Sequence, residues 1–149
     1  MTKLQNVSHQ EAIAAWAKRC YFTGRVLMEQ TLRPYGLGAT QWYVLYQLTH
    51  KGSMKQRDLM RQLQLERATL SIIIGTLVRK ELVEQLPDED DLRQKQLRIT
   101  PVGIELWSKL PDLTFIHEVA FGGIDEAELQ VAVRVLQIAT GRLESLLQK

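Results

Sequence analysis

Cysteine and long apolar runs are scarce in this chain of 149 residues, and each scarcity excludes a class of protein. The single cysteine, Cys20, cannot form a disulfide within the chain, which excludes a disulfide-stabilised scaffold. No apolar stretch approaches the roughly 20 residues that a membrane-spanning helix needs. The polar N-terminus, with His9 and Glu11, lacks the basic-then-apolar pattern of a signal peptide. We therefore expect a soluble, cytoplasmic protein.

Motifs for catalysis and metal binding are also missing. The sequence contains no metalloprotease motif, phosphate-binding loop, nucleophile elbow or dinucleotide-binding fingerprint. Its histidines, His9, His50 and His117, stand at no spacing typical of zinc ligands. We expect neither an enzyme, nor a metal site, nor a cofactor.

The composition is that of a globular domain, and its charge is unevenly spread. Apolar residues make up 45% and charged residues 24%, which fits one domain over residues 1–149. Residues 55–80 hold six basic and two acidic side chains, a local charge of +4 within a chain of net charge +2. A basic segment suits a polyanion such as nucleic acid. A solvated basic surface explains the charge equally well.

Apolar spacing predicts long helices at both ends of the chain, over about residues 8–32 and 125–147. Asp125, with Glu128 three residues later, is a capping-box variant that begins the last helix. Each terminal helix has two apolar stripes and therefore needs to bury more than one face. One small domain offers too few partners, so we expect these regions, about 8–34 and 125–147, to form a homodimer.

The middle of the chain predicts short helices followed by a hairpin. A helix over residues 40–50 has Thr40 as its expected N-cap, and short helices follow at about 55–63 and 66–80. Two strands, 82–86 and 96–100, flank a charged tip, and Thr100 then caps a helix with Pro101 at its first position. This order is typical of a winged helix-turn-helix, here over about residues 40–103, whose second short helix enters the DNA major groove. The expected fold class is mainly α, with a small β-hairpin wing and terminal dimerisation helices.

The sequence also resembles a known family in three places. The wing has Asp88, Asp91, Arg93, Leu97, Ile99, Thr100 and Gly103 in the register of the family pattern D-x-x-D-x-R followed by L-T-x-x-G, with isoleucine in the leucine place. The run Arg67-Ala68-Thr69-Leu70-Ser71, followed by Leu77, Lys80 and Leu82-Val83, is similar to the family's recognition helix. Leu37, Gln41 and Leu45 match its second helix. Over about residues 10–145 the chain resembles the MarR (multiple antibiotic resistance regulator) family of bacterial regulators.

This resemblance implies a dimeric DNA-binding protein and a role for particular residues. Arg93 would enter the minor groove, held by Asp91. Lys55 and Gln56 would lie near phosphates. The residues expected to face the major groove are Arg67, Ala68, Thr69, Ser71 and Thr76. Many family members repress their own or a neighbouring operon, so double-stranded DNA with a near-palindromic operator is the implied partner.

Three positions depart from the family pattern. Leu92 stands where many members have a second wing arginine, which predicts a weaker grip on DNA. Glu81 stands where the family usually has glycine, often with a positive φ, so glutamate there either costs about 1 kcal/mol or bends the local path. Gly38 replaces the serine or threonine that commonly begins the second-helix motif, and this leaves Thr40 to cap the helix.

The resemblance further implies a small aromatic or phenolic effector that relieves repression. The candidate binding residues are Trp16, Cys20, Trp42 and Tyr43, with Trp42 the foremost, although each aromatic ring fits a core position as well. Cys20 invites a second hypothesis, a single-cysteine redox sensor, but it shares an apolar stripe with Trp16, which favours a buried, inert thiol. A winged-helix protein-interaction module without DNA binding is a third hypothesis, and the intact Asp91 and Arg93 pair argues against it.

Overall fold

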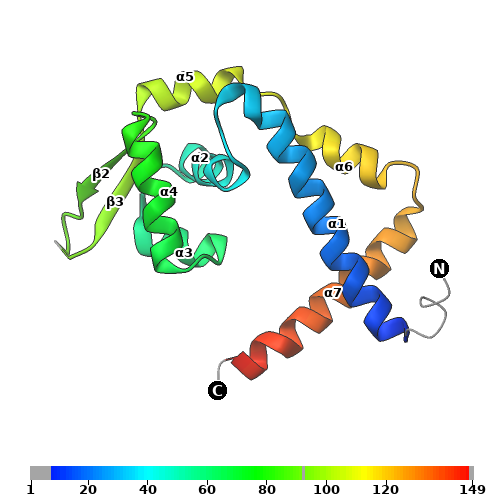
Figure 1. The fold of residues 1–149 in the computed structure, drawn as a ribbon. Helices are drawn as coiled ribbons and strands as arrows, with labels where there is room; N and C mark the ends of the chain where they lie inside the picture. Colours follow the sequence, from blue (N-terminus) through cyan, green and yellow to red (C-terminus); the bar gives the residue numbers. More distant parts are fainter. Residues whose placement is uncertain (1–7, 92, 148–149) are drawn as a thin grey trace. The chain divides into compact units, whose positions relative to one another are not determined.

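The computed structural model describes residues 8–91 and 93–147, and it divides between Asp112 and Leu113 into two units (Figure 1). The first unit contains α1 (His9–Leu32), the 3-10 helix η2 (Arg33–Tyr35), α2 (Ala39–Lys51), β1 (Met54–Lys55), α3 (Gln56–Leu63), α4 (Arg67–Arg79), β2 (Val83–Pro87), β3 (Lys95–Ile99) and α5 (Pro101–Lys109). The second contains α6 (Thr114–Phe121) and α7 (Glu126–Leu147). The predicted fold class, mainly α with a small wing, is confirmed. Leu92, one of the three departures from the family pattern, lies outside the described residues.

The core of the first unit forms where α2, α3, α4 and β3 meet. Its largest fully buried side chains include Leu45, Leu48, Leu59, Leu70, Ile74, Leu77 and Leu97. Burying one such side chain stabilises the fold by about 1.5–3 kcal/mol. Three of them lie along one row of α4, so this row fixes the rotation of α4 about its own axis and turns the opposite face to solvent.

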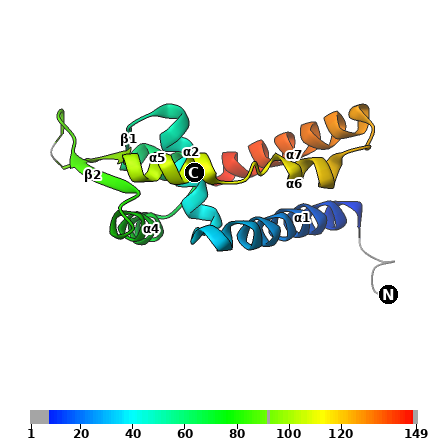
Figure 2. The ribbon, with the colours of Figure 1, turned by 90° about the horizontal axis from the view of Figure 1, so that it is seen from above.

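The wing belongs to a three-stranded antiparallel sheet of order β1-β3-β2. Val83 pairs with Ile99 at one end of the hairpin, and Pro87 pairs with Lys95 at the other. The hairpin was predicted, but β1 was not, because a strand of two residues has no alternation to detect. Met54 pairs with Leu97, which ties the start of α3 to the wing. The hairpin extends beyond α4 in both views (Figures 1 and 2).

Gly103 explains how the helix after the wing is seated. A Cβ atom at this position would lie 2.3 Å from the carbonyl oxygen of Leu82 and 2.7 Å from Cγ1 of Ile99. Only glycine permits this approach of α5 to the base of the hairpin. Thr100 caps α5 as predicted, since its Oγ1 accepts a hydrogen bond from the Gly103 backbone N–H at 3.0 Å.

The predicted capping of α2 by Thr40 is wrong. The N-cap is Gly38, and the backbone N–H of Ala39 donates to Oε1 of Glu29 on α1 at 2.8 Å. Thr40 lies within the first turn, where its Oγ1 accepts a hydrogen bond from Nη2 of Arg25 at 2.6 Å. The carboxylate of Glu29, 10 positions before Ala39 in the sequence, therefore accepts the hydrogen bond at the start of α2 that a local hydroxyl was expected to accept.

Glu81 adopts the left-handed conformation that its position in the family pattern predicted, with φ of 64°. The Leu82 N–H donates to the Leu77 carbonyl at 3.0 Å, and the Glu81 N–H donates to the Val78 carbonyl at 2.9 Å. These two bonds form a Schellman motif, which usually has glycine at the left-handed position. The turn between α4 and the wing is thus held by backbone hydrogen bonds despite the unfavourable positive φ of Glu81.

The second unit presents much apolar surface in the single chain. α7 was predicted, and the Asp125 carboxylate accepts a hydrogen bond from the Ala127 N–H at 3.4 Å at its start. α6 was not predicted. Large apolar side chains exposed on the two helices include Val119, Val131, Val133, Leu136, Leu143 and Leu146. Among the described residues, no helix combines the length and the apolar character needed to cross a membrane.

Candidate nucleic-acid interface

The outer face of α4 carries most of the residues predicted to meet the major groove. Arg67, Ala68, Thr69 and Ser71 are exposed. Arg67 is the first residue of α4, and no hydrogen bond or ion pair joins its side chain to the rest of the described chain. A guanidinium at this position is free to bond an external partner. A helix that presents small residues and an unpaired arginine has the shape and donors that major-groove binding needs.

Thr76 differs from the other predicted contacts because its hydroxyl is already engaged. Its Oγ1 donates to the Ile72 carbonyl and accepts from Nη2 of Arg79, both at 3.1 Å. The side chain is part-buried. Thr76 therefore supports the position of Arg79, and its assignment as a base contact stays a prediction.

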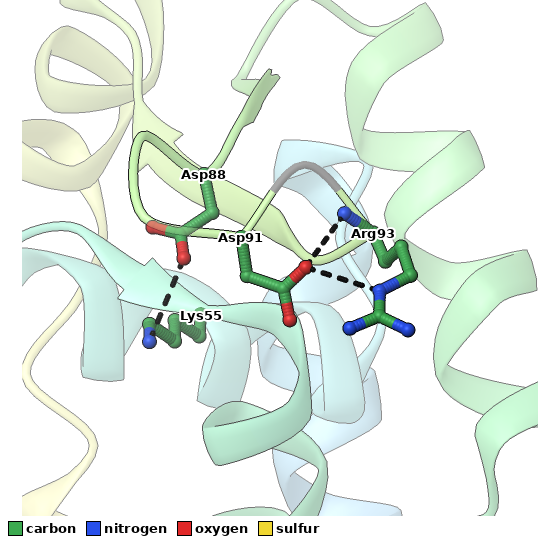
Figure 3. A network of polar contacts seen from close by, with 4 residues as sticks. All are labelled: Lys55, Asp88, Asp91 and Arg93. Atoms are coloured by element: carbon green, nitrogen blue, oxygen red, sulfur yellow. Dashed lines mark hydrogen bonds and ion pairs between the residues drawn. The ribbon is translucent and has the colours of Figure 1, made fainter.

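The wing carries an oriented arginine. Figure 3 shows Oδ1 of Asp91 accepting from the backbone N–H of Arg93 at 3.0 Å and lying 3.4 Å from its Nε. Neither contact uses the terminal nitrogens of the guanidinium. The Arg93 side chain is 92% exposed, so this pair adds little to stability and chiefly restricts the direction of the side chain. A cation held in this way suits the focused negative potential of a narrow minor groove.

The acidic tip of the wing is more neutral than the sequence suggests. Asp88 is buried, and its Oδ2 lies 3.5 Å from Nζ of Lys55 (Figure 3). Asp91 faces Arg93. Glu89 and Asp90 are the exposed carboxylates between them. Two of the four acidic side chains are thus matched by cations, which lowers the repulsion of a DNA backbone.

The same contacts give Lys55 and Gln56 structural roles in addition to their predicted one. Lys55 ends β1 and compensates the buried charge of Asp88. The Gln56 side-chain oxygen accepts a hydrogen bond from Nε2 of Gln85 on β2 at 2.9 Å. Sequence reasoning missed both links. Asp88, the acidic residue that begins the family's wing pattern, was a signal for the link to Lys55. No local pattern in the sequence indicates the hydrogen bond between Gln56 and Gln85.

The aromatic candidates fall into separate groups. Trp42 stacks on Tyr46, with ring centroids 5.2 Å apart, and lies 5.3 Å from Trp107 of α5. Tyr43 meets Trp42 edge to face at 5.2 Å. Trp16 is 60% exposed on α1, and no ring contact joins it to this cluster in the described part of the chain. Sequence reasoning missed Tyr46 and Trp107, which only the packing of α5 brings to Trp42.

The expectation that Cys20 is buried is wrong for the single chain. Its side chain is exposed on α1. Nothing in the described part of its own unit buries the part of α1 around Cys20, because α1 buries only Met28 and Leu32, near its C-terminal end. Among the described residues, no group of three or more His, Cys, Asp or Glu side chains is placed to hold a metal ion.

Comparison with known proteins finds a family, a curated relative and solved structures that this chain is similar to. Residues 37–95 match the model of the MarR family. The chain is 26% identical over 132 residues to the HTH-type transcriptional repressor IacR of Pseudomonas putida, covering 88% of this chain and 79% of that protein. A MarR mutant from E. coli complexed with operator DNA superposes with a TM-score of 0.77 at 19% identity, covering 86% and 93% of the two chains. BpsR of Bordetella bronchiseptica, whose DNA binding is regulated by 6-hydroxynicotinic acid, gives a TM-score of 0.74 at 25% identity, with 87% and 99% covered.

Proposed function

We propose that the chain is a transcriptional regulator of the MarR family, whose model it matches over residues 37–95, and that it represses transcription by binding a near-palindromic operator as a homodimer. In each protomer α4 enters the major groove and Arg93 enters the adjacent minor groove. Each half-site is read by one protomer. The cytoplasm, where a bacterial operator is found, is the proposed location.

One observation carries this proposal most directly. The same unit presents an unpaired arginine at the start of an exposed helix and, on the wing beside it, a second arginine oriented by Asp91. A protein-interaction module would have no need to hold a nearly fully exposed cation in a fixed direction. The chain also shares its fold with a MarR protein that was crystallised with operator DNA.

Selection from random DNA duplexes tests the proposal. The enriched sequence should be a near-palindrome whose half-site centres are about one helical turn apart, roughly 10 base pairs. Enrichment of direct repeats, or of a single half-site, contradicts the proposed two-fold symmetric dimer. A failure to enrich any sequence favours the interaction module instead.

The homodimer is supported by the apolar surface of the second unit. Leu136, Leu143 and Leu146 are 42%, 63% and 67% exposed on α7. Clustered apolar side chains of this size on a helix usually mark an interface. Light scattering at micromolar concentration should report about twice the mass of the chain, 17.1 kDa. A monomer at that concentration removes the paired half-site mechanism.

We further propose that a small aromatic carboxylate or phenol weakens DNA binding. The regulation of BpsR by 6-hydroxynicotinic acid supports this class of effector. Such a ligand must bind the non-binding conformer more tightly, and this difference sets the size of its effect. Trp42→Ala should blunt the response to the ligand while leaving DNA affinity unchanged. If a broad library of aromatic acids leaves the affinity unaltered, the effector is not of this class.

The exposure of Cys20 favours one alternative signal, oxidation of this thiol. With one cysteine in each chain, a disulfide would have to join two protomers. Peroxide should then weaken DNA binding by the wild type and not by Cys20→Ser. Equal sensitivity of both proteins removes the redox hypothesis.

A further inference from the structure

The outer face of α4 has an apolar centre. Ile72 is 70% exposed, more than Val78, the other exposed large apolar side chain of this helix, at 37%. Single exposed apolar side chains are common and need no explanation in themselves. The position of Ile72 is informative, because at about 100° per residue it lies nearly opposite the buried row formed by Leu70, Ile74 and Leu77.

The residues one turn before and one turn after Ile72 add no free hydrogen-bonding group to this centre. Ala68 and Thr76 lie one turn before and one turn after it, on the same face of the helix. Ala68 has no polar atom. The hydroxyl of Thr76 is engaged by the Ile72 carbonyl and by Arg79. Ile72 and Ala68 therefore offer base edges only apolar contact.

One feature of the major-groove floor is apolar, namely the C5-methyl group of thymine. We propose that Ile72 contacts this methyl group in each half-site and so specifies a thymine there. This inference rests on the proposed function, since it assumes that α4 enters the major groove. Arg67 and Ile72 then divide the recognition, with the arginine bonding a base edge and the isoleucine packing on a methyl group.

The expected size of the effect follows from the burial of one methyl group. Its removal should weaken binding about fourfold for each half-site, equivalent to about 0.8 kcal/mol. Substitution in both half-sites should weaken binding by about sixteenfold. Ile72→Ala should leave the fold intact, because the side chain is largely exposed and alanine is a better helix former.

The test uses deoxyuridine, which keeps every hydrogen-bonding group of thymidine and lacks only the methyl group. The probe is the duplex enriched from a random library by the wild-type protein, with symmetric thymines replaced one pair at a time. The full-length wild type, Ile72→Ala and Val78→Ala are titrated against each duplex. Val78→Ala is the matched control, because it removes an apolar side chain from another face of the same helix.

The proposal expects one symmetric pair of replacements to weaken binding of the wild type and of Val78→Ala by about sixteenfold, and to leave Ile72→Ala unaffected. If the wild type binds the duplex but no replacement weakens it, the proposal is overturned and the proposed function stands. If every replacement that weakens binding does so equally for the wild type and for Ile72→Ala, the proposal is likewise overturned and the proposed function stands. If the wild type enriches no duplex, the proposed function itself fails.

Discussion

Replacement of Arg93 by alanine isolates the contribution of the wing tip to DNA binding. Asp91 is the only described partner of this side chain, and the pair is exposed, so we expect the free energy of unfolding to change by less than about 1 kcal/mol. Each cation that neutralises a phosphate contributes about 0.9 to the slope of log affinity against log salt. Two protomers therefore contribute about 1.8, and the affinity deficit of Arg93→Ala should shrink about twelvefold between 50 and 200 mM salt.

The assay is a fluorescence-anisotropy titration of the selected duplex at several salt concentrations. Arg142→Ala is the charge-matched control, since it removes an exposed arginine from α7. It should leave the salt slope unchanged apart from a small long-range effect. An Arg93→Ala protein with the wild-type affinity and slope would show that the wing tip does not touch DNA.

A double-mutant cycle tests the orienting role of Asp91. Asp91→Ala removes a negative charge near DNA, which favours binding in any background, and it also releases Arg93, which disfavours binding only where Arg93 is present. The difference between the two backgrounds measures the orientation alone. We expect Asp91→Ala to be less favourable with Arg93 than without it, and identical effects in both backgrounds would refute the orienting role.

Three further predictions concern stability, each measured by urea unfolding. Gly103→Ala should destabilise the protein by about 3 kcal/mol, because the new Cβ would lie 2.3 Å from the carbonyl oxygen of Leu82. Gly24→Ala in α1 is the control and should be neutral or stabilising, because nothing lies within 4 Å of a Cβ there. Equal effects of the two substitutions would contradict the close approach of α5 to the hairpin. Glu81→Gly should stabilise by about 0.5–1 kcal/mol by relieving the positive φ, and a destabilised variant would argue against strain there. Lys55→Ala should destabilise by leaving Asp88 buried and unpaired, and Asp88→Asn in the same protein should restore part of the loss; no rescue would mean that Lys55 acts in another way.

The α-helices other than α6 were predictable from sequence because their signals are local. Leu70, Ile74 and Leu77 repeat at helical spacing, and Thr100 with Pro101 marks a helix start whatever the rest of the chain does. The positive φ at Glu81 was equally accessible, since the family pattern has glycine at that position. These features depend on residues within about one turn of each other.

The features that sequence reasoning missed depend on distant partners. Glu29 reaches the start of α2 from another helix and makes a cap at Thr40 unnecessary. Lys55 and Asp88 are 33 positions apart, and only the pairing of β1 with β3 brings them together. Cys20 was expected to be buried because its stripe is apolar, but α1 buries only Met28 and Leu32 within its own unit, near its C-terminal end. Periodicity reports that a face is apolar and does not report what covers it.

The central claim is that α4 reads a specific DNA sequence, and a base-by-base titration of the selected operator tests it most directly. The wild type should bind the selected duplex at least about 10³-fold more tightly than a scrambled duplex of the same composition. Arg67→Ala should lose its preference at one base pair in each half-site, worth about 1–3 kcal/mol, and retain the others. Equal affinity of the wild type for selected and scrambled duplexes, or an unchanged preference at every base pair in Arg67→Ala, would contradict the account.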